Sequence, residues 1–307
     1  MKIPAGAGRR NAMELLPFDK VAYEALNHYC NKLENHLKSD VFLFYGGIHP
    51  NHRTFFTSEF EKLARKKRHK SLAVNLTTNG GSVEMAEIMV EVMRRFYDEV
   101  YFIVHEYAYS AGTILCMSGD KIYMNFASSL GPIDPQVLSN GQWAPAQGYL
   151  DQFDAICKKS LNNDPQNPIS PVELQMALNL NLADLNFYQQ ARNLTVTLLK
   201  KWLVKYKFKD WTVHNKTKTE VTSKEKEDRA EQIAKILGNN AHWHIHGRHI
   251  GIKTLQNELK LKIEDYSDNI ELYNSIKEYN RLAIDFSSKY NYQLFLHTRE
   301  MTNGSLL

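Results

Sequence analysis

Short apolar segments alternate with amphipathic segments over the first third of the chain. Three apolar segments with few polar side chains occupy residues 41–45, 72–76 and 100–104. Two stretches with apolar residues at helical spacing, 58–67 and 83–96, lie between them. Strands covered on both faces of a sheet become continuous apolar runs, so this order predicts a β-α-β-α-β unit built on a buried parallel sheet.

The segment 83–96 carries the clearest helical pattern. Its methionines and other apolar residues fall on one stripe, and its glutamates lie largely off that stripe. A helix that packs on a sheet needs such a stripe. We therefore interpret these methionines as core residues and not as a methionine-rich binding face.

The rest of the chain is mainly helical in pattern, with one inserted region. Further helices are expected at 18–37, 150–159, 182–206, 221–237 and 270–286, and a last strand at 292–296. Turn-rich stretches on both sides of the second of these helices predict an inserted cap at about 137–180. The expected divisions are an N-terminal helical segment (1–40), an α/β core that contains the cap (41–200) and a C-terminal helical extension packed on the core (201–307).

The composition is that of a folded protein and does not point to a nucleic-acid partner. Of the 307 residues, 43% are hydrophobic and 23% are charged, which is enough apolar material for a sizeable core. The net charge of +4 is modest. We interpret the basic stretches 65–70 and 200–229 as solvated faces, so no nucleic acid is expected as a partner.

Cysteine usage and hydropathy favour a cytoplasmic location. Cys30, Cys116 and Cys157 lie far apart, without the paired spacing of a disulfide framework or a thiolate zinc site. No stretch approaches the roughly 18 uninterrupted apolar residues of a membrane span, and residues 1–13 lack the apolar region of a signal peptide. We therefore expect no membrane span.

Two turns at the ends of predicted strands are candidates for chemistry. Gly80 and Gly81 follow the strand at 72–76, and two glycines allow the backbone to turn its N–H groups outward, where they can stabilise an oxyanion. A plain strand-to-helix turn with Ser82 as the helix N-cap is the structural alternative.

The second turn places Ser110 at the start of a short helix, 114–118. Its hydroxyl and the following amide, that of Ala111, can face one reacting oxygen, although a serine at this position is also a common N-cap. Ser110 follows Gly81 by 29 residues, one helix and one strand. Adjacent parallel strands would therefore deliver both turns to one crevice.

Four short motifs together resemble a known family. They are Asn79-Gly80-Gly81-Ser82-Val83, Tyr109-Ser110-Ala111-Gly112-Thr113, Gly119-Asp120-Lys121-Ile122 and Ser129-Leu130-Gly131-Pro132-Ile133-Asp134-Pro135. In this order and spacing they resemble the Clp-protease/crotonase fold and, within it, the serine dehydrogenase proteinase family. The resemblance spans about 41–136 and reappears at His246-Gly247.

The resemblance implies both a fold and an activity. The fold is α/β, a repeated β-β-α core with a mostly parallel sheet, joined by the helical insertion and the helical C-terminal region. The activity is hydrolysis of peptides or unfolded proteins by Ser110, with an oxyanion hole at Gly80, Gly81 and Ala111 and with no cofactor. Members of this fold tend to form homo-oligomers, and an unfoldase or other regulatory partner is a further expectation.

The general base is less evident in the sequence. Clp-type proteases have a histidine soon after the serine helix, whereas this chain has Asp134 there, which can orient a base, bind substrate or belong to a proline-flanked turn. His246 is the preferred base because the resembled family carries a similar His-Gly element. Lys121 is a further candidate, as in serine-lysine dyads, and it also fits as a charged strand-edge residue.

Neighbouring histidines leave one more alternative open. His242, His244 and His249 also lie near His246, and in an extended strand the alternation of the first two with His246 would place three imidazoles on one face. Such a face is compatible with a metal site, although no acidic ligand lies nearby in sequence, so no metal is expected.

Three other functions fit parts of the pattern. A catalytically silent Clp-like scaffold that binds peptides or partners is favoured by the histidine missing from 131–135. A crotonase-type enzyme would use the same oxyanion hole for an acyl-CoA thioester, but Ser110 at the nucleophile position makes it the weaker hypothesis. An α/β-hydrolase elbow is approximated by Ala108-x-Ser110-x-Gly112, but its first glycine is an alanine here.

Overall fold

The protein is built on a six-stranded, mostly parallel sheet. The computed structural model describes residues 16–139, 142–162, 166–214 and 217–300. The strand order is β10-β1-β2-β3-β5-β9, and every neighbouring pair is parallel except β1 with β10. The strands are β1 (Asp40–Gly46), β2 (Ser71–Thr77), β3 (Glu99–Val104), β5 (Lys121–Met124), β9 (Glu264–Asp265) and β10 (Leu294–His297). The mixed α/β class predicted from the sequence is confirmed.

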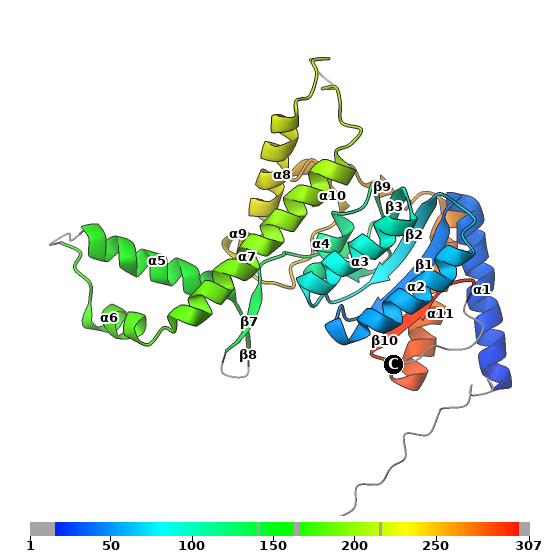
Figure 1. The fold of residues 1–307 in the computed structure, drawn as a ribbon, viewed down its shortest axis with the longest axis horizontal. Coiled ribbons are helices and arrows are strands. Elements are labelled where there is room, and N and C mark those ends of the chain that lie inside the picture. Colours follow the sequence, from blue (N-terminus) through cyan, green and yellow to red (C-terminus); the bar gives the residue numbers. More distant parts are fainter. Residues whose placement is uncertain (1–15, 140–141, 163–165, 215–216, 301–307) are drawn as a thin grey trace, which may run out of the picture.

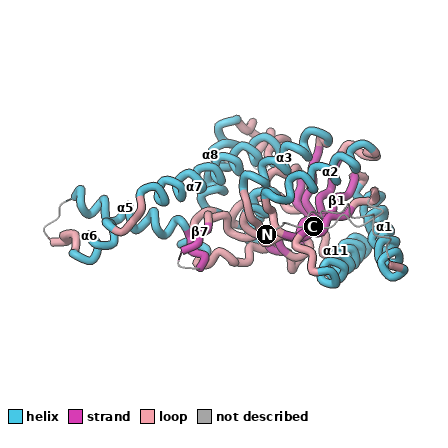
Figure 2. The backbone as a smooth tube through the Cα atoms, turned by 60° about the horizontal axis from the view of Figure 1, so that its bottom comes forward, coloured by secondary structure: helices cyan, strands magenta, loops and turns pink. Residues whose placement is uncertain are grey.

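Helices cover both faces of this sheet, which explains the uninterrupted apolar runs. One layer contains α2 (Arg53–Arg65), α3 (Val83–Phe96) and α4 (Ala111–Cys116), and the other contains α1 (Pro17–Leu37) and α11 (Ile270–Tyr290) (Figures 1 and 2). In β1, Phe42 and Phe44 belong to the core on the first side, and Val41 and Leu43 belong to the core on the second side. Alternate residues of one run are therefore buried on opposite faces.

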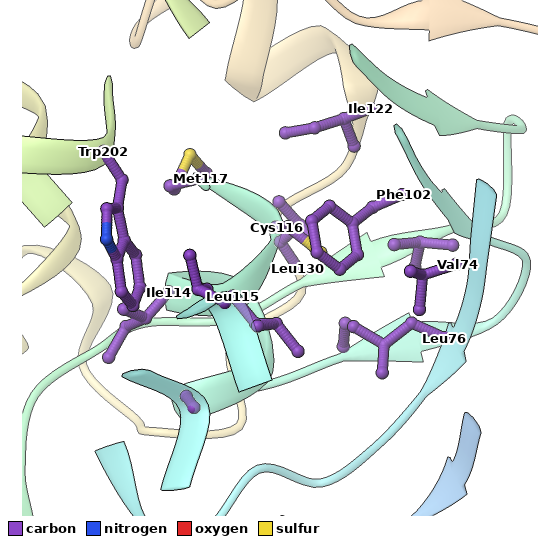
Figure 3. Packing of buried hydrophobic residues seen from close by; sticks show 14 of the residues in the cluster. Val74, Leu76, Phe102, Ile114, Leu115, Cys116, Met117, Ile122, Leu130 and Trp202 are labelled. Atoms are coloured by element: carbon purple, nitrogen blue, oxygen red, sulfur yellow. The ribbon is translucent and has the colours of Figure 1, made fainter. Parts of the chain in front are cut away.

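The α3 helix has the bounds expected from its apolar stripe. Ser82 is its N-cap and accepts a hydrogen bond from the backbone N–H of Met85 at 3.0 Å. Met85, Met89 and Met93 are buried in the core, so their interpretation as packing residues is confirmed. The same core continues into α4, where Leu115 and Cys116 lie near Val74, Leu76 and Phe102 (Figure 3).

Short extended segments follow the long strands and form a second level at their carboxyl ends. Ile48, after β1, bridges Gly81, and Thr78, after β2, bridges Ala108. This second level continues with β4 (Tyr107–Ala108), which pairs in parallel with β6 (Ser129–Leu130). A long strand, a short strand and a helix thus recur along the chain, as expected for a β-β-α repeat.

The inserted region forms an arm that projects from the sheet. It comprises the hairpin β7 (Gln136–Ser139) and β8 (Gln142–Pro145), α5 (Ala146–Asn162), α6 (Pro171–Leu178) and the first part of α7 (Leu182–Trp202) (Figures 1 and 2). The α7 helix returns to the core, where Leu198, Leu199 and Trp202 are buried, and it continues as a π-helical turn, Leu203–Lys207. This region extends outward and does not lie on the sheet as a layer (Figures 1 and 2).

The C-terminal region is more than a helical extension. It contains α8 (Ser223–Leu237), α9 (Asn240–Trp243) and α10 (Ile252–Asn257), as well as the two edge strands β9 and β10. A 3₁₀ turn, Pro50–His52, precedes α2. None of the helices in the described part of the chain has both the length and the apolar composition needed to cross a lipid bilayer.

Candidate active site

The diglycine bend and Ser110 are in direct contact. Gly80 has a φ of 98°, and a Cβ atom at this position would lie 2.8 Å from Cβ of Ser110 and 2.6 Å from the carbonyl oxygen of Tyr109. Any larger residue would therefore collide with the serine turn. The two turns predicted to share one crevice do so, because β2 and β3 are neighbours in the sheet.

Ser110 stands at the N-cap position of α4 but does not cap the helix. Its side chain accepts no hydrogen bond from the helix, and within the described residues the hydroxyl has no hydrogen-bond partner. The side chain is half-buried, and the backbone has a φ of 53° and a ψ of −119°. A strained residue with a hydroxyl that serves no structural purpose is typical of a functional site.

The N–H group of Gly81 points away from Ile48 and toward the neighbouring segment that leads to Ser110. The carbonyl oxygen of Gly80 accepts a hydrogen bond from the N–H of Ile48 at 2.9 Å. In a trans peptide the next N–H points in the opposite direction, so the N–H of Gly81 is directed away from Ile48. Ile48 follows β1, on one side of β2, and Ser110 follows β4, on the other.

The N–H group of Ala111 lies at the same bend. Ala111 is the first residue of α4, and the carbonyl oxygen of Ser110 accepts from the N–H of Ile114, so the N–H of Ala111 points out of the helix N-terminus. A Cβ atom on Gly80 would lie 3.1 Å from this nitrogen. Within the described residues, the amides of Gly81 and Ala111 donate no hydrogen bond, so both are available to an oxyanion.

Asp134 and His246 form a second pair. Nδ1 of His246 lies 2.8 Å from Oδ1 of Asp134, whose side chain is fully buried, while the imidazole is 26% exposed. The amide nitrogens of Gln136 and Asn240 donate to Oδ2 of Asp134 at 2.7 and 3.3 Å. The carboxylate is therefore held on both oxygens, and Nε2 of the imidazole is free of this contact.

The segment that leads to Asp134 begins beside the serine turn. The hydroxyl of Thr113, on α4, lies 2.8 Å from the carbonyl oxygen of Ala108 and 2.9 Å from that of Gly131. Gly131 also packs against the ring of Tyr109. In the described residues there is no hydrogen bond between Ser110 and His246, so the two pairs do not form a closed triad in this structure.

The alternative bases are placed elsewhere. Lys121 pairs with Tyr101 near the start of β3, whereas Ser110 follows the opposite, carboxyl end of that strand. The Nζ atom of Lys121 lies 4.7 Å from the centroid of the Tyr101 ring. This placement matches the strand-edge interpretation of Lys121 and separates it from the serine turn.

The alternative of three histidines on one face of a strand does not occur. Asn240–Trp243 form the α9 helix, and His244 follows with a φ of 69°, so the three imidazoles do not share a strand face. His242 instead lies 3.4 Å from Glu258, and His246 is bound to Asp134. The described residues contain no group of three or more His, Cys, Asp or Glu side chains arranged to hold a metal ion.

Sequence reasoning did not identify two members of the region, Gln136 and Asn240. Both touch Asp134 through side-chain amides, and Asn240 lies 106 residues from it along the chain. Amide side chains occur throughout the sequence without a motif to mark them. Only the docking of the α8–α9 connection against Asp134, where the N–H of Ile133 donates to the carbonyl oxygen of Leu237, brings Asn240 into place.

Comparisons with known proteins agree with the motifs. Residues 59–164 match the family described as ClpP-like SDH-type serine proteinase, and this segment includes Gly80, Ser110 and Asp134 but not His246. The resemblance stated above is thus confirmed over that segment, which supports a serine peptidase.

One relative and two solved structures are similar to parts of the chain. An uncharacterized protein of Methanocaldococcus jannaschii is 31% identical over 106 residues, which are 33% of this chain and 36% of that protein. A mutant of the 1510-N membrane-bound stomatin-specific protease has a TM-score of 0.44 at 12% identity, over 77% of this chain and 84% of its own. Another mutant of the same protease, in complex with a substrate peptide, has a TM-score of 0.31 at 19% identity, over 40% and 61%.

Proposed function

We propose, from the premise that residues 59–164 match the ClpP-like SDH-type serine proteinases, that this chain cleaves peptides or unfolded proteins through an acyl-enzyme on Ser110. The observation that carries the proposal is the contact of Gly80 with a strained Ser110 whose hydroxyl caps nothing. This contact supports Ser110 as the nucleophile, because its hydroxyl and two outward-directed amides lie at one bend.

The proposed reaction uses the two pairs in sequence. His246 takes the proton of the Ser110 hydroxyl on Nε2 while Oγ attacks the peptide carbonyl carbon. The amides of Gly81 and Ala111 bind the negative oxygen of the tetrahedral intermediate. The leaving amine then receives the proton from His246, and an ester remains on Ser110. Water, deprotonated by the same imidazole, hydrolyses this ester and restores the serine.

Asp134 serves this mechanism by holding the imidazole. Its buried carboxylate lies on Nδ1 of His246, so it orients the ring and stabilises the imidazolium that forms during proton transfer. In the resting structure Ser110 and His246 are not joined by a hydrogen bond, and catalytic contacts of this kind are often completed only when substrate is bound.

A fluorophosphonate probe tests the proposal, because it reacts only with an activated serine. We expect the probe to label the wild-type protein on Ser110, and the Ser110→Ala variant to remain unlabelled. In the same assay, His246→Ala is expected to lower the labelling rate by about 100-fold or more. Peptide mapping by mass spectrometry identifies the labelled residue.

Ser118→Ala provides the matched control. Ser118 follows the other end of the same helix, and its hydroxyl is already bound to the carbonyl oxygen of Leu115 at 2.6 Å. Its replacement should leave the labelling of Ser110 intact. Labelling that persists in Ser110→Ala would overturn the assignment of the nucleophile.

A silent scaffold that binds peptides is the second candidate. It is favoured by the absence of a hydrogen bond between Ser110 and His246 within the described residues. A wild-type protein that binds unfolded polypeptide but never reacts with the probe would support the scaffold and contradict the peptidase.

The remaining expectations belong to the same proposal. The three free cysteines, two of them buried, support a reducing, cytoplasmic location. Assembly of several copies and cooperation with an unfoldase follow from the family resemblance, and the exposed apolar side chains of the arm support the first of these.

A further inference from the structure

Both oxygens of the Asp134 carboxylate have side-chain hydrogen-bond partners. Oδ1 faces Nδ1 of His246, and Oδ2 receives the side-chain amides of Gln136 and Asn240. Because Asp134 is fully buried, water cannot replace a donor that is lost. The direction of Oδ1, and with it the orientation of the imidazole, depends on what holds Oδ2.

The two amides come from separate elements that are themselves anchored. Gln136 is the first residue of β7, at the base of the arm, where the carbonyl oxygen of Pro135 accepts from the N–H of Ala146. Asn240 is the first residue of α9, and the side chain of Asn239 caps this helix by accepting from the N–H of His242. Asp134 is therefore held between β7, at the base of the arm, and α9, which immediately precedes the segment of His246.

We propose that Asn240 and Gln136 are positioning residues, which hold Oδ2 of Asp134 so that Oδ1 fixes the proton of His246 on Nδ1 and leaves Nε2 as the proton acceptor. The effect on catalysis rests on the proposed peptidase function. The positioning itself concerns two side-chain contacts and can be measured in the absence of any substrate.

The proposal has a structural consequence. The two amide donors fix the plane of the Asp134 carboxylate, and its burial leaves no water to do so in their place. If one donor is removed, the carboxylate can turn, and the proton of neutral His246 is no longer confined to Nδ1.

The experiment is NMR of the full-length protein with ¹⁵N-labelled histidine, because the nitrogen shifts report which ring nitrogen carries the proton. In the wild type we expect neutral His246 to carry its proton on Nδ1. In Asn240→Leu the form protonated on Nε2 should appear beside it, because the carboxylate that selects the tautomer is no longer held on both oxygens. Gln136→Leu should change the tautomer in the same way, which keeps the test available if one variant fails to fold.

Asn239→Ala is the matched control. It removes the amide next to Asn240 in sequence and the cap of α9, but no contact to Asp134. Its thermal stability should fall while neutral His246 keeps its proton on Nδ1, as in the wild type. A merely structural role for Asn240 predicts the same behaviour in Asn240→Leu, and that result would overturn the proposal.

Peptidase kinetics separate this proposal from the proposed function. In Asn240→Leu, kcat should fall by up to about 100-fold with little change in KM. Asn240→Gln, which keeps an amide donor, should recover part of kcat. If the variants change the tautomer of His246 while the wild type has no peptidase activity, the positioning role is supported and only the peptidase is contradicted.

Discussion

Ser110 holds its backbone where residues with a side chain are rarely found. A φ of 53° with a ψ of −119° suits glycine, and the cost for another residue is about 1–3 kcal/mol. The strain exposes the hydroxyl at the bend and turns the N–H of Ala111 toward Gly80. A hydroxyl at this strained position is what the proposed nucleophile requires, which would offset the conformational cost.

The strain predicts that Ser110→Gly stabilises the protein. We expect its free energy of unfolding to exceed that of Ser110→Ala by about 1 kcal/mol, because glycine relieves the backbone strain. The greater conformational entropy of glycine in the unfolded chain offsets only part of this gain. Urea denaturation of the two variants measures this difference. Ser118→Gly, at an ordinary φ, should be destabilised, and a Ser110→Gly protein less stable than Ser110→Ala would refute the claim of strain.

At the scale of elements, α6 is a helix without a core. Its Ser170 capping box defines the start, yet none of its eight residues is buried. Four large apolar side chains are more than half exposed: Val172, Leu174, Met176 and Leu178. Helices this short are not stable from local propensity alone. In the described residues α6 is tied to α5 by the ion pair of Lys159 with Glu173, and we predict that a second copy of this chain covers its exposed apolar side chains.

The oligomer can be tested on α6 with two neighbouring substitutions. Leu174→Glu should shift the population toward monomer, because it places a charge where an apolar contact is expected. Gln175→Glu adds the same charge to the same helix at a polar, exposed position and should leave the assembly intact. Light scattering after size-exclusion chromatography gives the masses, and a monomeric wild type at micromolar concentration would contradict the prediction.

At the scale of the whole molecule, the two ends of the described chain close one edge of the sheet. The last strand, β10, pairs antiparallel with β1, and Arg299 after it binds the buried carboxylates of Glu34 and Asp40. His297, in β10, is completely buried with its Nδ1 2.7 Å from the hydroxyl of Tyr279. This closure makes stability dependent on a histidine that must stay neutral.

The pH dependence of stability follows from buried histidines. Burial lowers the pKa of His297 to about 3, and burial together with the charge of Lys277 lowers the pKa of His105 to about 4. Below the ordinary value of 6.5, the unfolded chain therefore binds protons that the folded chain does not. Stability should be complete above this pH and fall as the pH decreases, by up to about 1.4 kcal/mol per unit for each histidine.

Urea denaturation between pH 7 and about pH 4.5 measures this slope. His297→Gln, which is neutral at every pH and can still accept a hydrogen bond, should flatten it. His28→Gln removes an exposed histidine of α1 and should not. Equal slopes in the wild type and His297→Gln would show that this histidine does not control the acid sensitivity.

Local pattern was enough to predict the elements near the site. The stripe of α3 and the apolar runs of β1, β2 and β3 depend on neighbours within a few residues, and they appear with nearly the expected bounds. The contact between the Gly80 turn and Ser110 was predictable for a related reason. Two parallel strands joined by one helix lie side by side, so their carboxyl ends must meet.

Long-range packing decided the rest. The short edge strand β9 exists because the sheet offers an open edge, and its own sequence is too short to show a period. The strand expected at 292–296, by contrast, is present as β10. The sequence left open whether His242, His244 and His246 belong to a strand, because alternation over only five residues is too short to exclude one. In the structure, residues 240–243 form α9. The bond between Asp134 and His246 joins residues 112 apart, a distance over which no local spacing carries information.

The amino-acid order by itself thus determined the α/β class, the helices around the sheet and the meeting of Ser110 with the diglycine turn, because each depends on interactions close along the chain. The tertiary structure alone decided which histidine meets a carboxylate, which amides hold that carboxylate, and that the insertion projects as an arm. These depend on how distant segments compete for the same buried surface, and that competition is settled only when the whole chain packs.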